Sequence, residues 1–354
     1  MKKLILLLLL LSLTLTGCVV YIGDSTLSLP TAPSVPEGEY LRVHFIDVGQ
    51  ADCALVESGG QYMLIDGGNV EDGQLVVSYL MDQGVQELAY VVCSHAHEDH
   101  VGGLPSVLAV FPTENVLSPT TTYSSGCFDD FMHYADQQDL TVQIPKPGDS
   151  FLLGGAVVTV YGPVKSYAET NDTSIVMKVV FGETSFLFTG DMETAAENDM
   201  LDYWEGKDSL HADVLKVGHH GSDTSTGYRF LYEVSPTYGV ISVGTGNTYG
   251  HPHDEPMSRL NDAGVTLFRT DMLGTVIALS DGREISFTWE NQSADPDNAE
   301  PANPTGQTYI GNKNSKKFHT ESCGSLPKAE NQVIFDSYEA AIEAGYTPCG
   351  SCLG

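Results

Sequence analysis

The feature that most constrains this chain of 354 residues is the segment 94–103, which reads SHAHEDHVGG. It directly follows the apolar run Leu88 to Cys93, which predicts a buried strand. A strand that ends in three imidazoles and a carboxylate delivers them to one edge of a sheet, and borderline metals such as zinc prefer these nitrogen and oxygen ligands. The segment therefore predicts a metal site, with solvated loop histidines as the alternative, and the candidate ligands are His95, His97, Asp99 and His100.

Two later strand ends carry residues of the same kind. The run Thr184 to Phe188 continues into Thr189-Gly190-Asp191, and the run Leu210 to Val217 continues into GHHGS at 218–222. A carboxylate at a strand end is well placed to bridge two cations, which makes Asp191 a further candidate ligand. Because His219 and His220 are adjacent in a loop, one can bind a metal while the other holds a substrate oxygen. The sequence does not distinguish the two roles.

The segment SHAHEDHVGG resembles the signature of the metallo-β-lactamase superfamily. Together with HFIDVGQADCALVE at 44–57 and LIDGG at 64–68, it is similar to the metallo-β-lactamase domain of ComEC-type competence proteins. This resemblance implies an α/β fold of the αββα sandwich type, with two packed mixed sheets flanked by helices. It also implies two divalent metal ions, zinc or alternatively manganese, held by the candidate ligands above and by one of His219 and His220. Asp99 would also orient the nucleophile.

The same resemblance nominates residues that contact substrate. Segment 169–176 reads ETNDTSIV where many members have a third histidine for the first metal site, so Asn171 and Ser174 are candidates and that site is short of one ligand. Lys216 either neutralises a phosphate or is a solvated strand residue, and Ser222 follows the histidine pair. His251, in NTYGHPH at 247–253, is the candidate for binding the leaving or bridging oxygen, and His253 fits a surface role nearly as well. Asp52 and Asp66 are either site residues or loop-packing residues.

The globular body is placed at 39–290 by its hydrophobic patterning, and the resemblance implies that it is a metallo-β-lactamase-like hydrolase domain. Strands are predicted at 41–46, 53–57 and 61–65, and helices at 70–83 and 104–111. Segment 112–150 is predicted to be rich in loops, with His133 as a surface residue. The last three strands, 265–269, 275–280 and 284–289, are expected to close the second sheet.

The N-terminal segment predicts export and lipidation. Lys2 and Lys3 precede an apolar run that is too short for a comfortable membrane span, and 15–18 reads LTGC, which resembles a bacterial lipobox. We therefore expect residues 1–18 to be a lipoprotein signal with Cys18 acylated, and an uncleaved anchor helix is the alternative. Residues 19–38, with three prolines, form a linker, so the protein should be extracytoplasmic and anchored to the cell membrane.

A second linker, 291–305, leads to a small module at 306–354. The module offers an H-x-x-x-C and a C-x-x-C set, namely His319, Cys323, Cys349 and Cys352. These residues suit a closed tetrahedral zinc site, and a module of this size needs such support. It resembles the metal-binding domain of the Ada DNA-repair protein, with His319 in place of one cysteine. A disulfide among the three cysteines is the alternative.

Net charge limits the choice of substrate. The chain has 16 Lys and Arg against 47 Asp and Glu, a formal charge of −31, which disfavours electrostatic capture of a polyanion. The family resemblance favours a phosphodiesterase that acts on DNA, whereas the charge favours a small or cell-wall phosphoester such as phosphorylcholine. A non-catalytic surface-binding lipoprotein is the third hypothesis. We expect a monomer.

Overall fold

The computed structural model describes Val35, residues 38–294, Pro296, and residues 308–321, 323–335, 338–350 and 352–353. The predicted signal segment with Cys18, and most of both predicted linkers, lie outside the described residues. Among the helices that are described, none has both the length and the apolar character needed to cross a bilayer.

The first sheet has eight strands in the order β15-β14-β1-β2-β3-β4-β5-β6. Its central strands are the apolar runs that the sequence predicts, and β3, β4 and β5 pair in parallel. The strands are β1 Leu41–Phe45, β2 Ala54–Ser58, β3 Gln61–Ile65, β4 Leu88–Val92, β5 Thr113–Leu117, β6 Val142–Gln143, β14 Val276–Ser280 and β15 Ile285–Trp289.

The second sheet has seven strands in the order β13-β12-β11-β10-β9-β8-β7. Strands β10 to β13 are parallel neighbours, so their carboxyl ends lie at one edge. The strands are β7 Ser150–Leu153, β8 Ala156–Gly162, β9 Val176–Phe181, β10 Thr184–Phe188, β11 Val214–Lys216, β12 Tyr238–Ile241 and β13 Thr266–Arg269.

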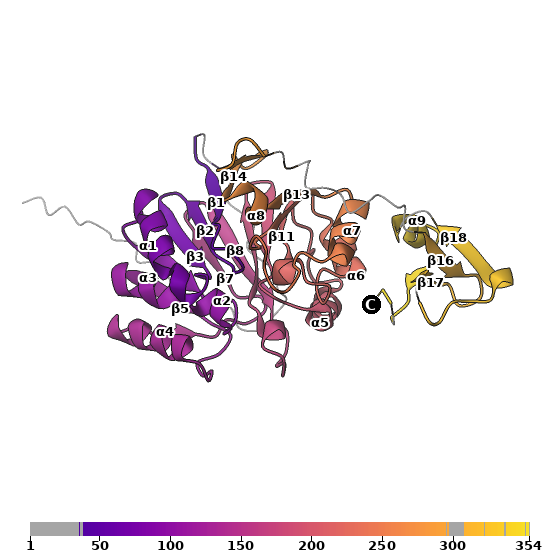
Figure 1. Ribbon diagram of the computed structural model, residues 1–354, viewed down its shortest axis with the longest axis horizontal. Helices are drawn as coiled ribbons and strands as arrows, with labels where there is room; N and C mark the ends of the chain where they lie inside the picture. The colour runs from indigo at the N-terminus through magenta and orange to yellow at the C-terminus, as the bar shows by residue number, and fades with distance from the viewer. Residues whose placement is uncertain are drawn as a thin grey trace, which may run out of the picture.

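Figure 1 shows the two sheets with helices on the outer face of each, and three apolar clusters of buried side chains hold these layers together. Between the sheets, residues such as Phe45 and Met63 pack against Val179 and Phe186. Outside the first sheet lie α1 Gly73–Asp82, α3 Leu104–Val110 and α4 Gly126–Gln137, and outside the second lie α5 Thr194–Trp204, α6 Tyr228–Val234 and α7 Asp254–Asp262. The expected αββα sandwich is therefore confirmed.

Two expectations about the body were wrong. Segment 112–150 is not mainly loop, because it forms β5, β6 and the twelve-residue α4, whose Phe128 and Phe131 are buried against the first sheet. His133 lies exposed on this helix. Strands β14 and β15 join the first sheet beside β1 rather than closing the second, because the chain turns back after β13 through α8, Thr270–Leu273.

The C-terminal module is a separate small sheet in the order β18-β16-β17-β19. Its apolar cluster contains Tyr309, Phe318 and Phe335 together with Tyr228 of α6. The elements are β16 Tyr309–Asn312, β17 Lys317–Thr320, β18 Gln332–Phe335, α9 Tyr338–Glu343 and β19 Thr347–Pro348.

Candidate metal centre

The predicted ligands come from loops that follow strands of both sheets. His95, His97, Asp99 and His100 follow β4 of the first sheet, and the last two lie on the short helix α2, Glu98–Val101. Asp191 follows β10, the histidine pair follows β11, and His251 follows β12 of the second sheet. Because these strands end toward the same side of the sandwich, loops that are far apart in sequence meet there.

The Asp191 carboxylate lies at the centre of four imidazoles. Its Oδ1 is 3.3 Å from Nε2 of His100, and its Oδ2 is 3.8 Å from Nε2 of His95. The same Oδ2 is 3.7 Å from Nε2 of both His219 and His220. Asp191 is therefore placed as a bridging ligand would be, with one ring nitrogen of each histidine turned toward it.

The outer nitrogens of two of these rings are held by acceptors. Nδ1 of His100 is 2.9 Å from Oδ2 of Asp66, and Nδ1 of His220 is 2.9 Å from the carbonyl oxygen of Ser242. A metal-binding histidine usually donates its other N–H to such an acceptor, which fixes the tautomer and aims the lone pair at the metal. His220 is thereby the member of the pair with the orientation of a ligand deep in the cluster.

Several polar atoms inside the cluster have no hydrogen-bond partner although they are buried. They include Nε2 of His100, Nε2 of His220 and Oδ1 of Asp191. Unpaired buried polar atoms are costly, so in a stable protein something must satisfy them. One ligand atom from each of Asp99, His100, Asp191 and His220 lies within 4.8 Å of the others, and this nitrogen and oxygen set fits a divalent cation.

The pKa values of the buried histidines also indicate a site for a cation. Burial alone would lower the pKa of His220, but Asp191 and Asp52 outweigh it and raise the pKa to about 10. Likewise, burial of His100 is outweighed by Asp191, Asp66 and Asp99, which raise its pKa well above the usual value. The cluster thus has a strong field that attracts positive charge, and protons supply that charge when no cation is present.

Lys216 lies beneath this cluster. Its side chain is buried, and its Nζ is 2.9 Å from Oδ2 of Asp52, whose Oδ1 is in turn 3.3 Å from Nδ1 of His220. The alternative of a solvated strand residue is therefore wrong. The geometry makes Lys216 and Asp52 a support for His220, and direct contact between Lys216 and a substrate phosphate stays a prediction.

The remaining candidates around Asp191 differ in position. His97 is half-buried, with its Nδ1 3.1 Å from Nε2 of His95. Ser174 is buried, accepts from the backbone N–H of Asp191 at 3.1 Å and donates to the Asn171 carbonyl at 2.7 Å. Asn171 donates to Glu193 at 3.1 Å, and the buried Ser222 is bonded to Thr224. Ser174 and Ser222 thus serve as loop supports, and their substrate contact stays a prediction.

His251 is held by a residue that sequence reasoning did not single out. Oε1 of Gln50 accepts from the backbone N–H of Gly244 at 3.1 Å, so its amide nitrogen faces Nδ1 of His251 at 3.3 Å. His251 therefore carries its proton on Nε2. Burial, followed by the nearby His220 and His219, lowers the pKa of His251 to about 4, which keeps the ring neutral. His253 lies at the surface, where its Nδ1 accepts from the Asp223 backbone.

The sequence also left the importance of three acids unresolved or unnoticed. Asp52 and Asp66 are both buried against the histidines, and Glu193 lies 3.4 Å from Nδ1 of His219. Their positions in the sequence could have indicated a role at the site, because Asp52 is an isolated acid just before an apolar strand and Asp66 is one just after an apolar strand. Glu193 offers no such signal, since it begins a helix in which acids are common.

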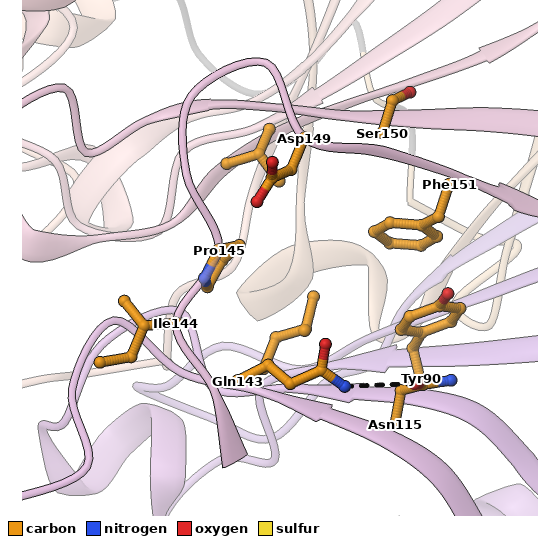
Figure 2. A pocket seen from close by; sticks show the side chains of 10 residues that line it. Tyr90, Asn115, Gln143, Ile144, Pro145, Asp149, Ser150 and Phe151 are labelled. Atoms are coloured by element: carbon orange, nitrogen blue, oxygen red, sulfur yellow. Dashed lines mark hydrogen bonds between the residues drawn. The ribbon is translucent and has the colours of Figure 1, made fainter. Parts of the chain in front are cut away.

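A pocket elsewhere in the body is unrelated to this centre. It lies between β5, β6 and the segment 149–151, where the rings of Tyr90 and Phe151 stack at 4.0 Å and Gln143 donates to Asn115 (Figure 2). None of the candidate ligands lines it.

The C-terminal module contains a second ligand cluster. One ligand atom from each of His319, Cys323, Cys349 and Cys352 lies within 4.8 Å of the others, and all three cysteines are free thiols. No disulfide joins these three cysteines in the structure, and one imidazole with three thiols is a ligand set that suits zinc.

Comparisons with known proteins agree with both parts. The family described as the metallo-beta-lactamase superfamily matches residues 46–245, and the metal binding domain of Ada matches residues 298–353. ComE operon protein 3 of Bacillus subtilis (strain 168) is 27% identical over 259 residues, which cover 68% of this chain and 33% of that protein. Competence protein ComA of Neisseria gonorrhoeae is 31% identical over 248 residues, covering 69% and 33%.

The chain thus spans about a third of the length of the curated relatives it matches. Among solved structures, the metallo-beta-lactamase fold protein YhfI from Bacillus subtilis is similar with a TM-score of 0.46 and 13% identity, covering 68% of this chain and 100% of that one.

Proposed function

Because the chain belongs to the metallo-beta-lactamase superfamily, we propose that it is a metal-dependent phosphodiesterase that works outside the cytoplasm. The observation that carries the proposal is the Asp191 carboxylate surrounded by four ring nitrogens, with buried ligand atoms that have no other partner. Metal-dependent hydrolysis is the chemistry that this donor set supports best.

One cation would be held by Asp99, His100, Asp191 and His220. A second would be held by His95, His97 and Asp191, since Nε2 of His95 lies 3.1 Å from Nδ1 of His97 and 3.8 Å from Oδ2 of Asp191. When bound, such cations supply Lewis-acid chemistry that promotes attack of water on an ester at neutral pH. The first set is complete in the structure. The second is the one that lacks a histidine at position 174.

Two side chains at the centre are suited to act on water and substrate. Burial opposes ionisation of Asp99, but the nearby His100 and His220 lower its pKa to about 2, so its carboxylate is suited to accept a hydrogen bond from the attacking water. His251 carries its proton on Nε2 and stays neutral, so it is suited to donate a hydrogen bond to a substrate oxygen. Asp99 is partly exposed, which gives water a route to it.

The names of the relatives favour DNA as the substrate. ComE operon protein 3 and competence protein ComA are similar over the body of the chain, and the ComEC-type and Ada-type resemblances of its two parts both imply proteins that process nucleic acid. The formal charge of −31 favours the second candidate, a small or cell-wall phosphodiester. Lys216, which lies beneath the ligands, is already bonded to Asp52 and is not free for a DNA backbone.

A substrate panel separates the candidates. Purified protein loaded with zinc or with manganese is tested on single- and double-stranded DNA, RNA, an aryl phosphodiester and a phosphorylcholine ester. We expect hydrolysis of DNA and of the aryl phosphodiester, with Asp191→Ala inactive on both. Hydrolysis of the small esters alone would favour the second candidate, and no turnover on any of them by metal-loaded protein would refute the phosphodiesterase.

The location is proposed from the N-terminal sequence. We propose that Cys18 is acylated and holds the body at the cell membrane, as the LTGC segment and the apolar run before it indicate. Wild-type protein should then leave membranes only with detergent, whereas Cys18→Ala should be unprocessed or secreted. Normal processing and membrane retention of Cys18→Ala would contradict the lipid anchor.

A further inference from the structure

The loop that carries the histidine pair has an unusual backbone. His219 and His220 both adopt left-handed conformations, with φ of 50° and 53°. This conformation costs free energy for residues other than glycine, and such strain persists only where the surroundings enforce it. Here the His219 N–H donates to the Gly190 carbonyl at 3.1 Å, and the Ser222 N–H donates to the His219 carbonyl at 2.8 Å. As a result, two consecutive side chains approach the same carboxylate of Asp191.

The protonation of His219 can be deduced from its neighbours. The Thr224 hydroxyl donates to Oε1 of Glu193 at 3.1 Å, so toward Nδ1 of His219, 3.1 Å away, it can only accept. Glu193 Oε1 is itself 3.4 Å from the same Nδ1. Because both neighbours accept, Nδ1 carries the proton, and Nε2, which lies 3.7 Å from Oδ2 of Asp191, is left with its lone pair available.

The position of Nε2 identifies the cation it would serve. Nε2 of His219 and Nε2 of His95 lie 3.7 and 3.8 Å from the same oxygen, Oδ2 of Asp191. His220 is occupied otherwise, since its Nε2 also lies 3.4 Å from Oδ2 of Asp99 in the other ligand set. The amide nitrogen of Asn171, which bonds Glu193, is 3.4 Å from Nε2 of His219 and is the group a cation would replace there.

We propose that His219 is the nitrogen ligand that completes the cation site of His95, His97 and Asp191, and that Glu193 is the residue that positions it. The inference rests on the metal centre of the proposed function. The two adjacent histidines thus bind different cations. The loop after β11 supplies the nitrogen ligand that is missing because position 174 is a serine and not a histidine. The side chain of His219 is 21% exposed and that of His220 is 2% exposed, so this site faces solvent more than its neighbour.

Cobalt(II) titration of the full chain after removal of bound metal tests the proposal. Visible absorption and calorimetry report binding at the two nitrogen and oxygen sites, and thiolate charge-transfer bands report the C-terminal cluster separately. Wild-type protein should bind two cobalt ions at the centre. In His219→Ala and Glu193→Gln, binding of one of the two should weaken by about 10- to 100-fold, as loss of a ligand's supporting acceptor typically does.

Asp223→Asn is the matched control, because Asp223 is an exposed acid of the same loop that contacts only His253 among the imidazoles. It should bind both ions as the wild type does. Glu193→Gln preserves the shape of a partly exposed side chain, so it keeps the test valid if His219→Ala fails to fold. Wild-type affinity for both ions in either variant, or a single ion at the wild-type centre, would overturn the proposal. Two ions with the expected pattern but no phosphodiester hydrolysis would refute only the proposed function.

Discussion

The two ligand clusters of this protein depend on their surroundings in opposite ways. The centre around Asp191 draws its ligands from three loops of a sandwich that three large apolar layers hold together. The C-terminal cluster draws four ligands from a small sheet whose apolar cluster is far smaller. In the body, the fold therefore creates the site, whereas in the module we expect the metal to stabilise the fold.

The largest expected effect is loss of the module's fold when its metal is removed. Structural zinc contributes on the order of 10–16 kcal/mol of apparent binding free energy in small domains. Chelator added to the full chain should make residues after 305 sensitive to limited proteolysis while the body stays intact. Cys349→Ser should behave in the same way without chelator, and Cys127→Ser, in α4 of the body, is the matched control. Sensitivity to reductant but not to chelator would instead indicate a disulfide.

Asp191→Ala should have the second largest effect, on function but not on fold. Because Asp191 lies between all four ring nitrogens, its loss should remove both cations and reduce hydrolysis to background. Loss of a general acid or base alone typically costs about 10²–10⁴ in rate, so a larger fall indicates metal loss. Metal content, activity and thermal melting are measured together. If Asp191→Ala stays active, the assignment of Asp191 as the shared ligand is wrong. If it unfolds when it loses its metal, the body depends on metal for its fold as the module does.

His251→Ala should have a smaller effect that leaves the cations in place. Removing one donor to a developing negative charge typically costs about 10²–10³ in kcat. Gln50→Ala should lower kcat in the same direction but less, because it frees the tautomer of His251 without removing the ring. Kinetics and metal content of both variants are compared with the wild type. Loss of metal from His251→Ala would place His251 among the ligands instead.

The smallest expected effect is a release of protons when the body binds its cations. Burial alone would lower the pKa of His220, but without a bound cation Asp191 and Asp52 raise it to about 10. At pH 7 the ring therefore carries a proton that a cation must displace. Calorimetry in buffers with different ionisation enthalpies should detect release of about one proton or more from the centre, and less from His220→Ala. No dependence on the buffer would contradict the protonated cluster.

Local sequence determined most of the scaffold and the identity of the ligands. Strands β1 to β4 and β10 were predicted within a residue or two, because each is a short apolar run bounded by glycine or acidic turns. Helix α4 was missed, since its polar residues mask an apolar face that only packing on the first sheet reveals. The destination of β14 and β15 was also missed, because strand pairing depends on where the chain turns and not on the strand's own residues.

For the candidate site, the sequence by itself determined which side chains can bind metal, since histidine and aspartate at strand ends are identifiable from residue type and spacing alone. Only the tertiary structure decided which of them would bind each cation and which would support a ligand or contact substrate. The orientation of His219 and His220, the burial of Lys216 against Asp52 and the hold of Gln50 on His251 all depend on contacts between residues far apart in the chain. The physical reason is that an imidazole's role depends on which nitrogen carries the proton, and its hydrogen-bond partners, brought by distant loops, fix that choice.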